Sequence, residues 1–473
     1  MRIRGVLISV SVVAGLWIAK AGEVSILALR DMSDVEVKSA GIVVPREITF
    51  HVKALGGGGS GEGMFSRGGR MFAYGWIINA DNRSLVWRMT ADNTSQAHDD
   101  RSFDGEVTLG PGNYEVYFTA YAFVSHTFFS HWETNVDHRQ NPLFGKGGKG
   151  HKGFFSFFTD LWADDITKEW GKRSKNWGIE LLSDESLASS VKSFSAPKEM
   201  ANVVLKATGL ADGALVRQGF SLTKPLSLRV YALGEGESGD DLADYGWIVD
   251  TRTRKRVWEM DSRDVSPAGG AEKNVEFTGD VRLEKGDYAL YYITDDSHSM
   301  ADWNQAPPDD PLNYGITITV GDPKDVKIVK PYTYEEDKNL IVAITRVGNN
   351  ENRTSGFTLK SDCAVRVYAF GERGNSRAQM ADYGYIMDAK TRQKVWTMDV
   401  DRTSHGGGAS KNRFVDEVIP LEKGSYIVAY NTDDSHAYGD WNADPPFDQD
   451  HYGISVMGMC DKFSAAMVAK YVE

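Results

Sequence analysis

Cysteine is scarce in this chain of 473 residues, which contains only Cys363 and Cys460. Two cysteines permit at most one disulfide, and in an oxidising compartment they would join the early and final strands of the last third of the chain. Two separate buried thiols are the alternative, because a sequence gives no Cα separation. Both readings stay open at this stage.

Positive charge is also in deficit. The chain has 53 Lys and Arg against 66 Asp and Glu, a formal net charge of -13. Phosphate binding needs a basic face, so this balance argues against nucleic acid as a partner. Beyond the N-terminus, no apolar run approaches the length of a membrane span, so we expect no membrane-spanning segment there.

The N-terminus has the pattern of a secretory leader. Arg2 and Arg4 precede an apolar run over residues 6–18, and Ala19-Lys20-Ala21 fits the small-x-small cleavage rule. We therefore expect residues 1–21 to be a signal peptide and the protein to be secreted, either periplasmic or extracellular. An N-terminal membrane anchor fits less well, because the apolar run is short.

The chain contains an internal repeat. Residues 243–316 recur as residues 381–454, 138 positions later and without a gap. The shared frame includes Ala-Asp-Tyr-Gly-x-Ile-x-Asp, Gly-Gly-Ala-x-Lys-Asn and Thr-Asp-Asp-Ser-His. A diverged third copy precedes them, since Tyr74-Gly75-Trp76-Ile77 matches Tyr245-Gly246-Trp247-Ile248. This pattern predicts three domains, over residues 22–197, 198–325 and 326–473, with linkers near residues 193–200 and 321–338.

The residue pattern of each copy predicts β-structure. Residues 226–231 alternate apolar and polar with period two, as a half-buried strand does. Residues 245–249 and 256–260 flank a polar tract and predict a hairpin, with Trp258 and Trp396 at equivalent buried positions. The Leu-x-x-Gly-x-Tyr element predicts a tyrosine corner. The fold class is therefore all-β, with three tandem β-sandwich modules of Ig-like or jelly-roll-like kind.

The second and third modules resemble tandem β-sandwich repeats of secreted bacterial proteins of unknown function. The residues that carry the likeness are Ala-Leu-Gly-Glu-Gly at 232–236, Asp-Tyr-Gly-Trp-Ile at 244–248, and the later Thr-Asp-Asp-Ser-His and Asp-Trp-Asn-x-x-Pro-Pro. The corner motif is also loosely similar to pre-peptidase C-terminal-like modules of secreted peptidases. The resemblance implies secretion and the fold, and it implies no chemistry.

An acidic loop is the first candidate site. It contains His298, Asn304 and Asp310 in the second module, and its oxygen-rich side chains suit Ca²⁺, although the spacing is not that of an EF-hand. The alternative is a structured loop whose side chains bond local backbone. Trp303 and Trp441 are tentative ligand-binding residues of this loop, and a core-edge role is their alternative. The tentative metal ligands are Asp295, Asp296, Asp302, Asp433, Asp434 and Asp440.

The Gly-Gly-Ala-x-Lys-Asn stretch, at residues 269–274 and 407–412, is the second candidate. Bare glycine backbone can approach a ligand closely, but a loop that needs unusual φ angles is the reading we favour.

The first module carries an insertion of about 37 residues, by comparison with the second. A glycine-lysine tract over residues 145–153 precedes apolar residues spaced every four, which predict a short amphipathic helix over residues 159–172. The helix either covers its own sandwich or offers a docking surface. The tentative ligand-binding residues here are Phe154, Phe155, Trp162, Trp170, Lys149 and Lys152.

These observations predict a secreted, non-catalytic binding or structural protein. Its partner would be an unknown protein, glycan or cell-surface component. The rival reading is a secreted hydrolase, a hydrolase accessory or a carbohydrate-binding protein that uses the Asp/His-rich loops. Ser297 and His298 are adjacent, so on an extended strand their side chains face opposite ways and do not form a catalytic pair. The two readings differ in whether the carboxylates line an open cleft.

Overall fold

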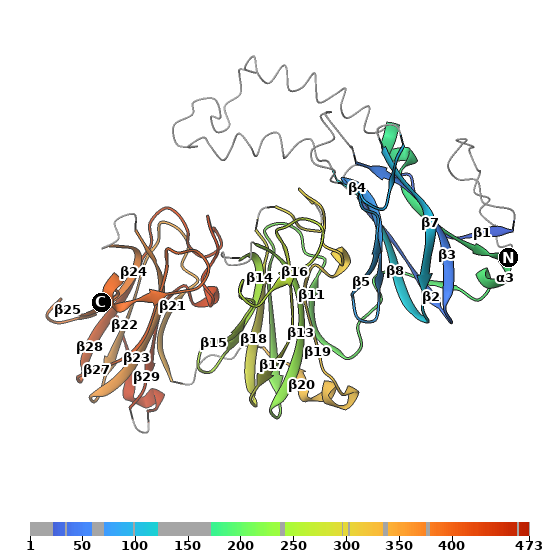
Figure 1. Ribbon diagram of the computed structural model, residues 1–473. Coiled ribbons are helices and arrows are strands. Elements are labelled where there is room, and N and C mark those ends of the chain that lie inside the picture. Colours follow the sequence, from blue (N-terminus) through green and yellow to red (C-terminus); the bar gives the residue numbers. More distant parts are fainter. Residues whose placement is uncertain are drawn as a thin grey trace, which may run out of the picture.

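The computed structural model describes residues 22–33, 36–58, 71–97, 100–121, 172–236, 242–295, 297–300, 303–333, 339–374, 379–460 and 463–472. Three β-sandwich modules follow one another in a row, coloured blue to green, green to yellow and orange to red in Figure 1. The expected all-β architecture is confirmed. The signal peptide expected over residues 1–21 lies outside the described residues.

The first module packs a β1-β9-β3-β7-β6 sheet against a β10-β2-β8-β4-β5 sheet. Two short helices, η2 (Ser174–Asn176) and α3 (Glu185–Ala188), flank β9. The strands are β1 (Glu23–Arg30), β2 (Glu36–Val44), β3 (Ile48–Gly57), β4 (Ala73–Asn79), β5 (Leu85–Arg88), β6 (Ser95–Ala97), β7 (Asp100–Leu109), β8 (Gly112–Ala120), β9 (Gly178–Asp184) and β10 (Lys192–Phe194).

The second module repeats this strand order, with β11-β19-β13-β17-β16 facing β20-β12-β18-β14-β15. The strands are β11 (Val203–Thr208), β12 (Leu215–Leu222), β13 (Leu226–Gly236), β14 (Leu242–Asp250), β15 (Lys255–Glu259), β16 (Ser266–Pro267), β17 (Asn274–Leu283), β18 (Gly286–Ile293), β19 (Gly315–Thr319) and β20 (Val329–Pro331). The 3-10 helices η3 (Pro311–Asn313) and η4 (Pro323–Ile328) precede β19 and β20. Because β20 pairs with β12, the second module continues past residue 325 into the expected linker.

The third module has the same order again, β21-β29-β23-β27-β26 and β30-β22-β28-β24-β25. Its strands are β21 (Leu340–Thr345), β22 (Asn352–Leu359), β23 (Cys363–Arg373), β24 (Met380–Asp388), β25 (Lys394–Thr397), β26 (Ser404–His405), β27 (Asn412–Leu421), β28 (Gly424–Asn431), β29 (Gly453–Gly458) and β30 (Val468–Tyr471). Its 3-10 helices are η5 (Val400–Arg402), η6 (Gln449–His451) and η7 (Ala465–Met467).

Period-two alternation places the core. In β13, Leu226, Leu228 and Val230 are buried while Ser227 and Arg229 face solvent. The tyrosine corner is present in every module: the hydroxyl groups of Tyr114, Tyr288 and Tyr426 donate to the carbonyl oxygens of Gly110, Glu284 and Glu422 at 3.1, 2.9 and 2.8 Å. The expected hairpin of β14 and β15 forms. Trp258 and Trp396 hold equivalent positions, although Trp396 is buried and Trp258 only half-buried.

The two sheets of the second and third modules meet at a corner. There, β13 pairs with β14 through Glu235 and Asp244, and β23 pairs with β24 through Glu372 and Asp382. The backbones approach so closely that a Cβ on Gly234 would lie 2.0 Å from the Asp244 carbonyl oxygen. Only glycine fits there, and the corner brings two acidic side chains together.

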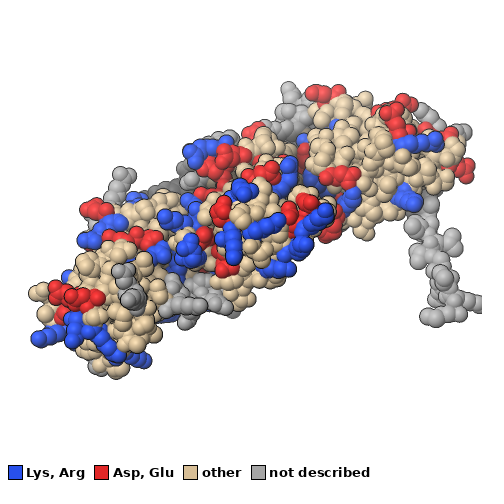
Figure 2. All heavy atoms as spheres, turned by 90° about the horizontal axis from the view of Figure 1, so that it is seen from below, with Lys and Arg blue, Asp and Glu red and all other residues tan. Residues whose placement is uncertain are grey.

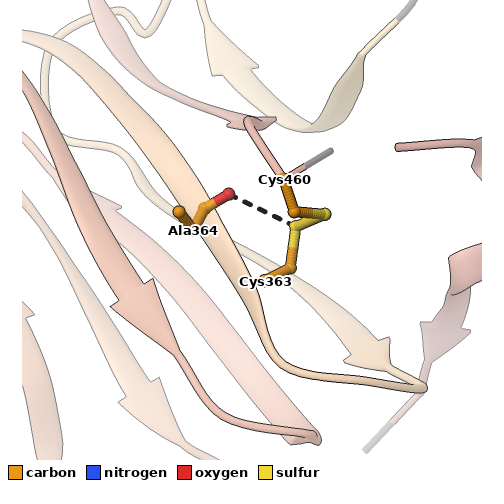
Figure 3. Close-up of a disulfide and its surroundings, with 3 residues drawn as sticks. All are labelled: Cys363, Ala364 and Cys460. Atoms are coloured by element: carbon orange, nitrogen blue, oxygen red, sulfur yellow. Dashed lines mark hydrogen bonds between the residues drawn. A yellow bond between two sulfur atoms is a disulfide. The ribbon is translucent and has the colours of Figure 1, made fainter. Parts of the chain in front are cut away.

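A disulfide joins Cys363 at the start of β23 to Cys460 after β29, closing a separation of 97 residues (Figure 3). Of the two readings that the sequence allowed, the bridge is therefore the one observed. It lies within the third module and does not cross to another. Figure 2 shows an elongated surface on which acidic and basic side chains are interspersed along all three modules.

Candidate functional site

Three carboxylates converge at the sheet corner of the second module and again at that of the third. Glu235, Asp244 and Asp295 place one oxygen each within 4.8 Å of one another, and Glu372, Asp382 and Asp433 do the same. Two of each set come from the paired strands of the corner, and the third comes from the loop that follows β18 or β28. The fold, rather than one continuous motif, assembles each group.

Hydrogen bonds fix the central aspartate of the second module. Asp244 is fully buried. Its Oδ1 accepts from the Asp295 backbone N–H at 2.8 Å, and its Oδ2 accepts from the Tyr314 hydroxyl at 2.6 Å. The Lys273 ammonium donates to Glu235 Oε1 at 2.7 Å. One Glu–Asp–Asp group thus carries three carboxylates and one ammonium.

The third module repeats these contacts with residues about 138 positions later. The Asp433 N–H donates to Asp382 Oδ1 at 2.8 Å, and the Tyr452 hydroxyl donates to Asp382 Oδ2 at 2.6 Å. Lys411 pairs with Glu372 at 3.0 Å. Recurrence of the same bonds in a diverged copy shows that the arrangement belongs to the fold of both modules.

Burial and neighbouring carboxylates raise the pKa of the glutamate and of the central aspartate of each cluster. Burial raises the pKa of Asp244 to about 8, against the opposing effect of the Tyr314 and Asp295 hydrogen bonds. Burial likewise raises the pKa of Glu235 to about 7 and that of Asp382 to about 7, and it raises the pKa of Glu372. A positive charge placed between the carboxylates would favour their ionised form.

One oxygen in each cluster lacks a partner among the described residues. Glu235 is 8% exposed and Glu372 6% exposed, yet Oε2 of each accepts no hydrogen bond there. A buried charged oxygen without a partner is costly. When all three carboxylates are ionised, they and the one ammonium leave a formal charge of minus two in each cluster. A divalent cation would satisfy both the unpaired oxygen and the charge, so the residues fit such an ion.

Some of the expected metal ligands lie in the clusters and others do not. Asp295 and Asp433 belong to the clusters. Asp434 and Asp440 are exposed, and Asp440 accepts from the Asn349 side chain at 2.8 Å. Neither is among the carboxylates that converge at the corner. Asp296 and Asp302 lie outside the described residues.

The histidine of the acidic loop is buried and hydrogen-bonded within its own module. His298 is fully buried, and its Nε2 donates to Asn274 Oδ1 at 2.6 Å, because the Asn274 amide N–H groups go to the Gly269 and Ala306 carbonyl oxygens. Burial lowers the pKa of His298 to about 3, so the ring is neutral. His436 and Asn412 repeat the bond at 2.6 Å.

The two loop tryptophans pack against these histidines. Trp303 is 4% exposed and meets the rings of His298 and Tyr314 edge to face, with centroids 4.9 and 5.0 Å away. Trp441 is half-buried and meets His436 and Tyr452 at 5.1 and 4.9 Å. These contacts fit the core-edge role of both residues.

The Gly-Gly-Ala-x-Lys-Asn stretch serves the same site. Gly269, Gly270, Gly407 and Gly408 have φ between +62° and +80°, the unusual conformation expected for this loop. The lysine of the motif pairs with the cluster glutamate, and the asparagine holds the histidine.

Sequence reasoning missed four cluster residues, Glu235, Asp244, Glu372 and Asp382. They lie inside Gly-Glu and Asp-Tyr-Gly segments that identify the repeat but do not look like a loop site. A usable signal was their joint absence from the first module. Equivalent close contacts at Gly56 and Ala73 place Gly57 at the Glu235 position and Ala73 at the Asp244 position. The first module also lacks Thr-Asp-Asp-Ser-His, so all three acids of the cluster are missing from it.

Two further aspartates at the end of the acidic loop, Asp309 and Asp310, make hydrogen bonds to the first module. Asp310 accepts from Arg83 Nε of the first module at 2.7 Å, and the Trp76 indole donates to the Asp309 carbonyl oxygen at 2.7 Å. Between the second and third modules, the Trp247 indole donates to the Phe447 carbonyl oxygen at 2.7 Å. The acidic loop therefore has two functions, one at the cluster and one at the junction.

The tentative ligand-binding residues in the insertion of the first module lie outside the described residues, as does the expected helix apart from Lys172. They are Phe154, Phe155, Trp162, Trp170, Lys149 and Lys152.

No known family model and no curated protein matches this sequence. Among solved structures, the CUB1-EGF-CUB2 domain of human MASP-1/3 is similar at 10% identity, over 53% of this chain and 96% of that one, with a TM-score of 0.17. A structure of the CBM32-1, CBM32-2 and M60 catalytic domains from Clostridium perfringens ZmpB is similar at 7% identity, with a TM-score of 0.15. That alignment covers 92% of this chain and about half of the other, 53%. Likeness at this level carries no argument about function. Within the described ranges, the helices are all too short or too polar to span a bilayer.

Proposed function

We propose that this chain is a secreted, non-catalytic binding and scaffolding protein whose second and third modules each hold a divalent cation, calcium foremost, at the Glu–Asp–Asp cluster. The observation that carries the proposal is the buried Oε2 of Glu235 and of Glu372, each without a hydrogen-bond partner among the described residues and each beside two further carboxylates. The cations would stiffen the loops that the module presents.

Calcium suits the donor set. All the convergent groups are carboxylates, the hard oxygen ligands that Ca²⁺ prefers, and Ca²⁺ tolerates irregular geometry better than Mg²⁺ does. The two oxygens of Asp244 already accept one hydrogen bond each, but a carboxylate oxygen has a second lone pair to offer. The alternative is a closed polar network in which a shared proton replaces the ion, and the raised pKa of Asp244 is compatible with that state too.

A hydrolase is less well supported. A general acid or a nucleophile must reach its substrate, whereas Asp244 and Asp382 are fully buried. An intact duplicate of the site also suits a binding array better than a catalyst. The disulfide supports an oxidising compartment, in line with the expected leader. The partner would be a protein, a glycan or a cell-surface component.

Calorimetry tests the cation. Titration of the chelator-treated full chain with CaCl2 should show two sites, and calcium should raise the unfolding temperature by mass action. Replacing both orphaned glutamates, Glu235→Gln with Glu372→Gln, should abolish binding. Asp440→Asn is the matched control, because Asp440 was an equally plausible ligand by sequence but does not belong to the cluster. Absence of heat at millimolar calcium, or equal loss in the control, would refute the cation site.

A further inference from the structure

The cation clusters and the module junctions share one short turn. In the second module this turn comprises residues 310–314. Asp310 precedes η3 and Tyr314 follows it. At one end the Tyr314 hydroxyl donates to Asp244 in the cluster, and at the other end Asp310 accepts from Arg83 of the first module. The turn is closed by the Asn313 amide, which donates to Asp310 at 3.0 and 3.1 Å.

The third module has the same arrangement at residues 448–452. Tyr452 donates to Asp382 in the cluster. Asp448, before η6, accepts from Tyr368 at 2.8 Å, and the Tyr368 hydroxyl also donates to the Arg254 carbonyl oxygen of the second module at 3.2 Å. One residue earlier, the backbone carbonyl oxygen of Phe447 accepts the hydrogen bond from the Trp247 indole N–H. Each junction is thus one turn away from a cluster.

The junction contacts are buried and specific. The Arg83 and Asp310 side chains are 5% and 2% exposed, and Arg83 also makes a two-pronged pair with Glu115 at 2.8 and 2.9 Å. At the second junction, Tyr368, Phe370 and Phe447 of the third module belong to the hydrophobic core of the second. Contacts of this kind hold only while the turn keeps its position, because a packed interface does not deform gradually.

From this connectivity we infer that cation occupancy of each cluster regulates the rigidity of the junction before it, with the tyrosine of the turn, Tyr314 or Tyr452, as the link. A bound cation draws the three carboxylates together and fixes the oxygen that accepts from the tyrosine. Without the cation, a proton can join only two of the three carboxylates, so the oxygen that accepts from the tyrosine is held less firmly and the turn opens more readily. Each junction is then stiff with the ion and hinged without it. This inference rests on the proposed cation sites.

Hydrogen exchange of the full chain tests the coupling. With CaCl2 rather than chelator, amides of residues 309–314 and of the Arg83 hairpin, residues 76–88, should exchange about 5- to 150-fold more slowly, the usual range for coupled sites. The hairpin is the decisive segment, because it belongs to the first module and contributes no ligand to the cluster.

The variant Tyr314→Phe keeps every carboxylate and removes the link. It should still bind calcium, with an affinity that the same calorimetry measures so that saturation can be matched to the parent, while residues 76–88 lose their response to the ion. Tyr288→Phe is the matched control and should keep the response. It also removes a tyrosine hydroxyl bond in the same module, but that bond belongs to the tyrosine corner at the start of β18.

The outcomes separate the two ideas. Calcium binding without any change at residues 76–88 would overturn the coupling and leave the proposed function standing. No calcium binding would overturn the proposed function itself. A full response in Tyr314→Phe would show that the tyrosine is not the link. If that variant unfolds, the parent protein still decides between coupling and its absence.

Discussion

Arg83 of the first module and Asp310 of the second form an ion pair from which solvent is almost excluded, with Nε and Oδ2 2.7 Å apart. Arg83 lies in the hairpin turn between β4 and β5 with φ of 63°, and Arg254 holds the equivalent place in the second module with φ of 57°. Left-handed backbone is unfavourable for arginine by about 1–2 kcal/mol. The exposed Arg392 of the third module has the same conformation, with φ of 62°, so this cost belongs to the hairpin turn rather than to the junction.

The first prediction concerns that pair. Arg83→Ala leaves Asp310 and Glu115 buried without their cation, so it should lower the free energy of unfolding of the junction by about 3–5 kcal/mol. Arg392→Ala, at the same turn position but exposed in the third module, should change stability by less than about 0.5 kcal/mol. Denaturant unfolding measures both, and equal effects would contradict the role of the junction.

The second prediction concerns the corner tyrosines. Tyr426→Phe removes a hydroxyl that donates to the Glu422 carbonyl oxygen at 2.8 Å. The loss should be about 0.5–1.5 kcal/mol, the net value of one hydrogen bond. Thermal unfolding of the full chain should show it in the third module alone. A neutral result would mean that water replaces the hydroxyl.

The third prediction concerns pH. The pKa of Asp244 is raised from 3.8 to about 8 in the folded protein. Without calcium, its contribution to stability is therefore complete below pH 4 and is lost as pH rises through 8. Protons compete with the cation over the same window. Calcium affinity should fall about tenfold for each pH unit below 8, for one displaced proton. Titrations at several pH values measure this, and a pH-independent affinity would refute a site built on Asp244.

The fourth prediction concerns the disulfide. A bridge that closes a separation of 97 residues stabilises the folded state by about 4–5 kcal/mol in the chain-entropy picture. Reductant should lower the unfolding temperature of the third module most and leave that of the first unchanged, because both cysteines lie in the third module. Calorimetry with and without reductant resolves this, and a uniform shift of all transitions would contradict it.

The sequence was sufficient for the repeat, the strands and the tyrosine corners, because these follow from local periodicity and turn chemistry. It was insufficient for the cluster. Asp295 and Asp433 were identified in an acidic loop, but Glu235 and Asp244 are about 50–60 residues earlier and meet Asp295 only because β13 and β14 pair at the sheet corner. It also assigned Asp310 to the same loop site as Asp295, whereas the inter-module contact takes Asp310 to Arg83. Long-range pairing and domain packing leave no spacing pattern along the chain.

The outer face of β24 differs from those of β4 and β14. In the first two modules a tryptophan stacks on the tyrosine opposite it, Trp76 on Tyr117 and Trp247 on Tyr291, at 5.2 Å. The third module has Tyr385 opposite Ala429 instead, and Lys394 lies over the Tyr385 ring at 4.3 Å. Exchanging the second and third modules would therefore remove the stacked pair from the internal junction and expose it at the outer end. The modules repeat one fold, but they are not interchangeable, because the stacked pair of the first two is replaced in the third.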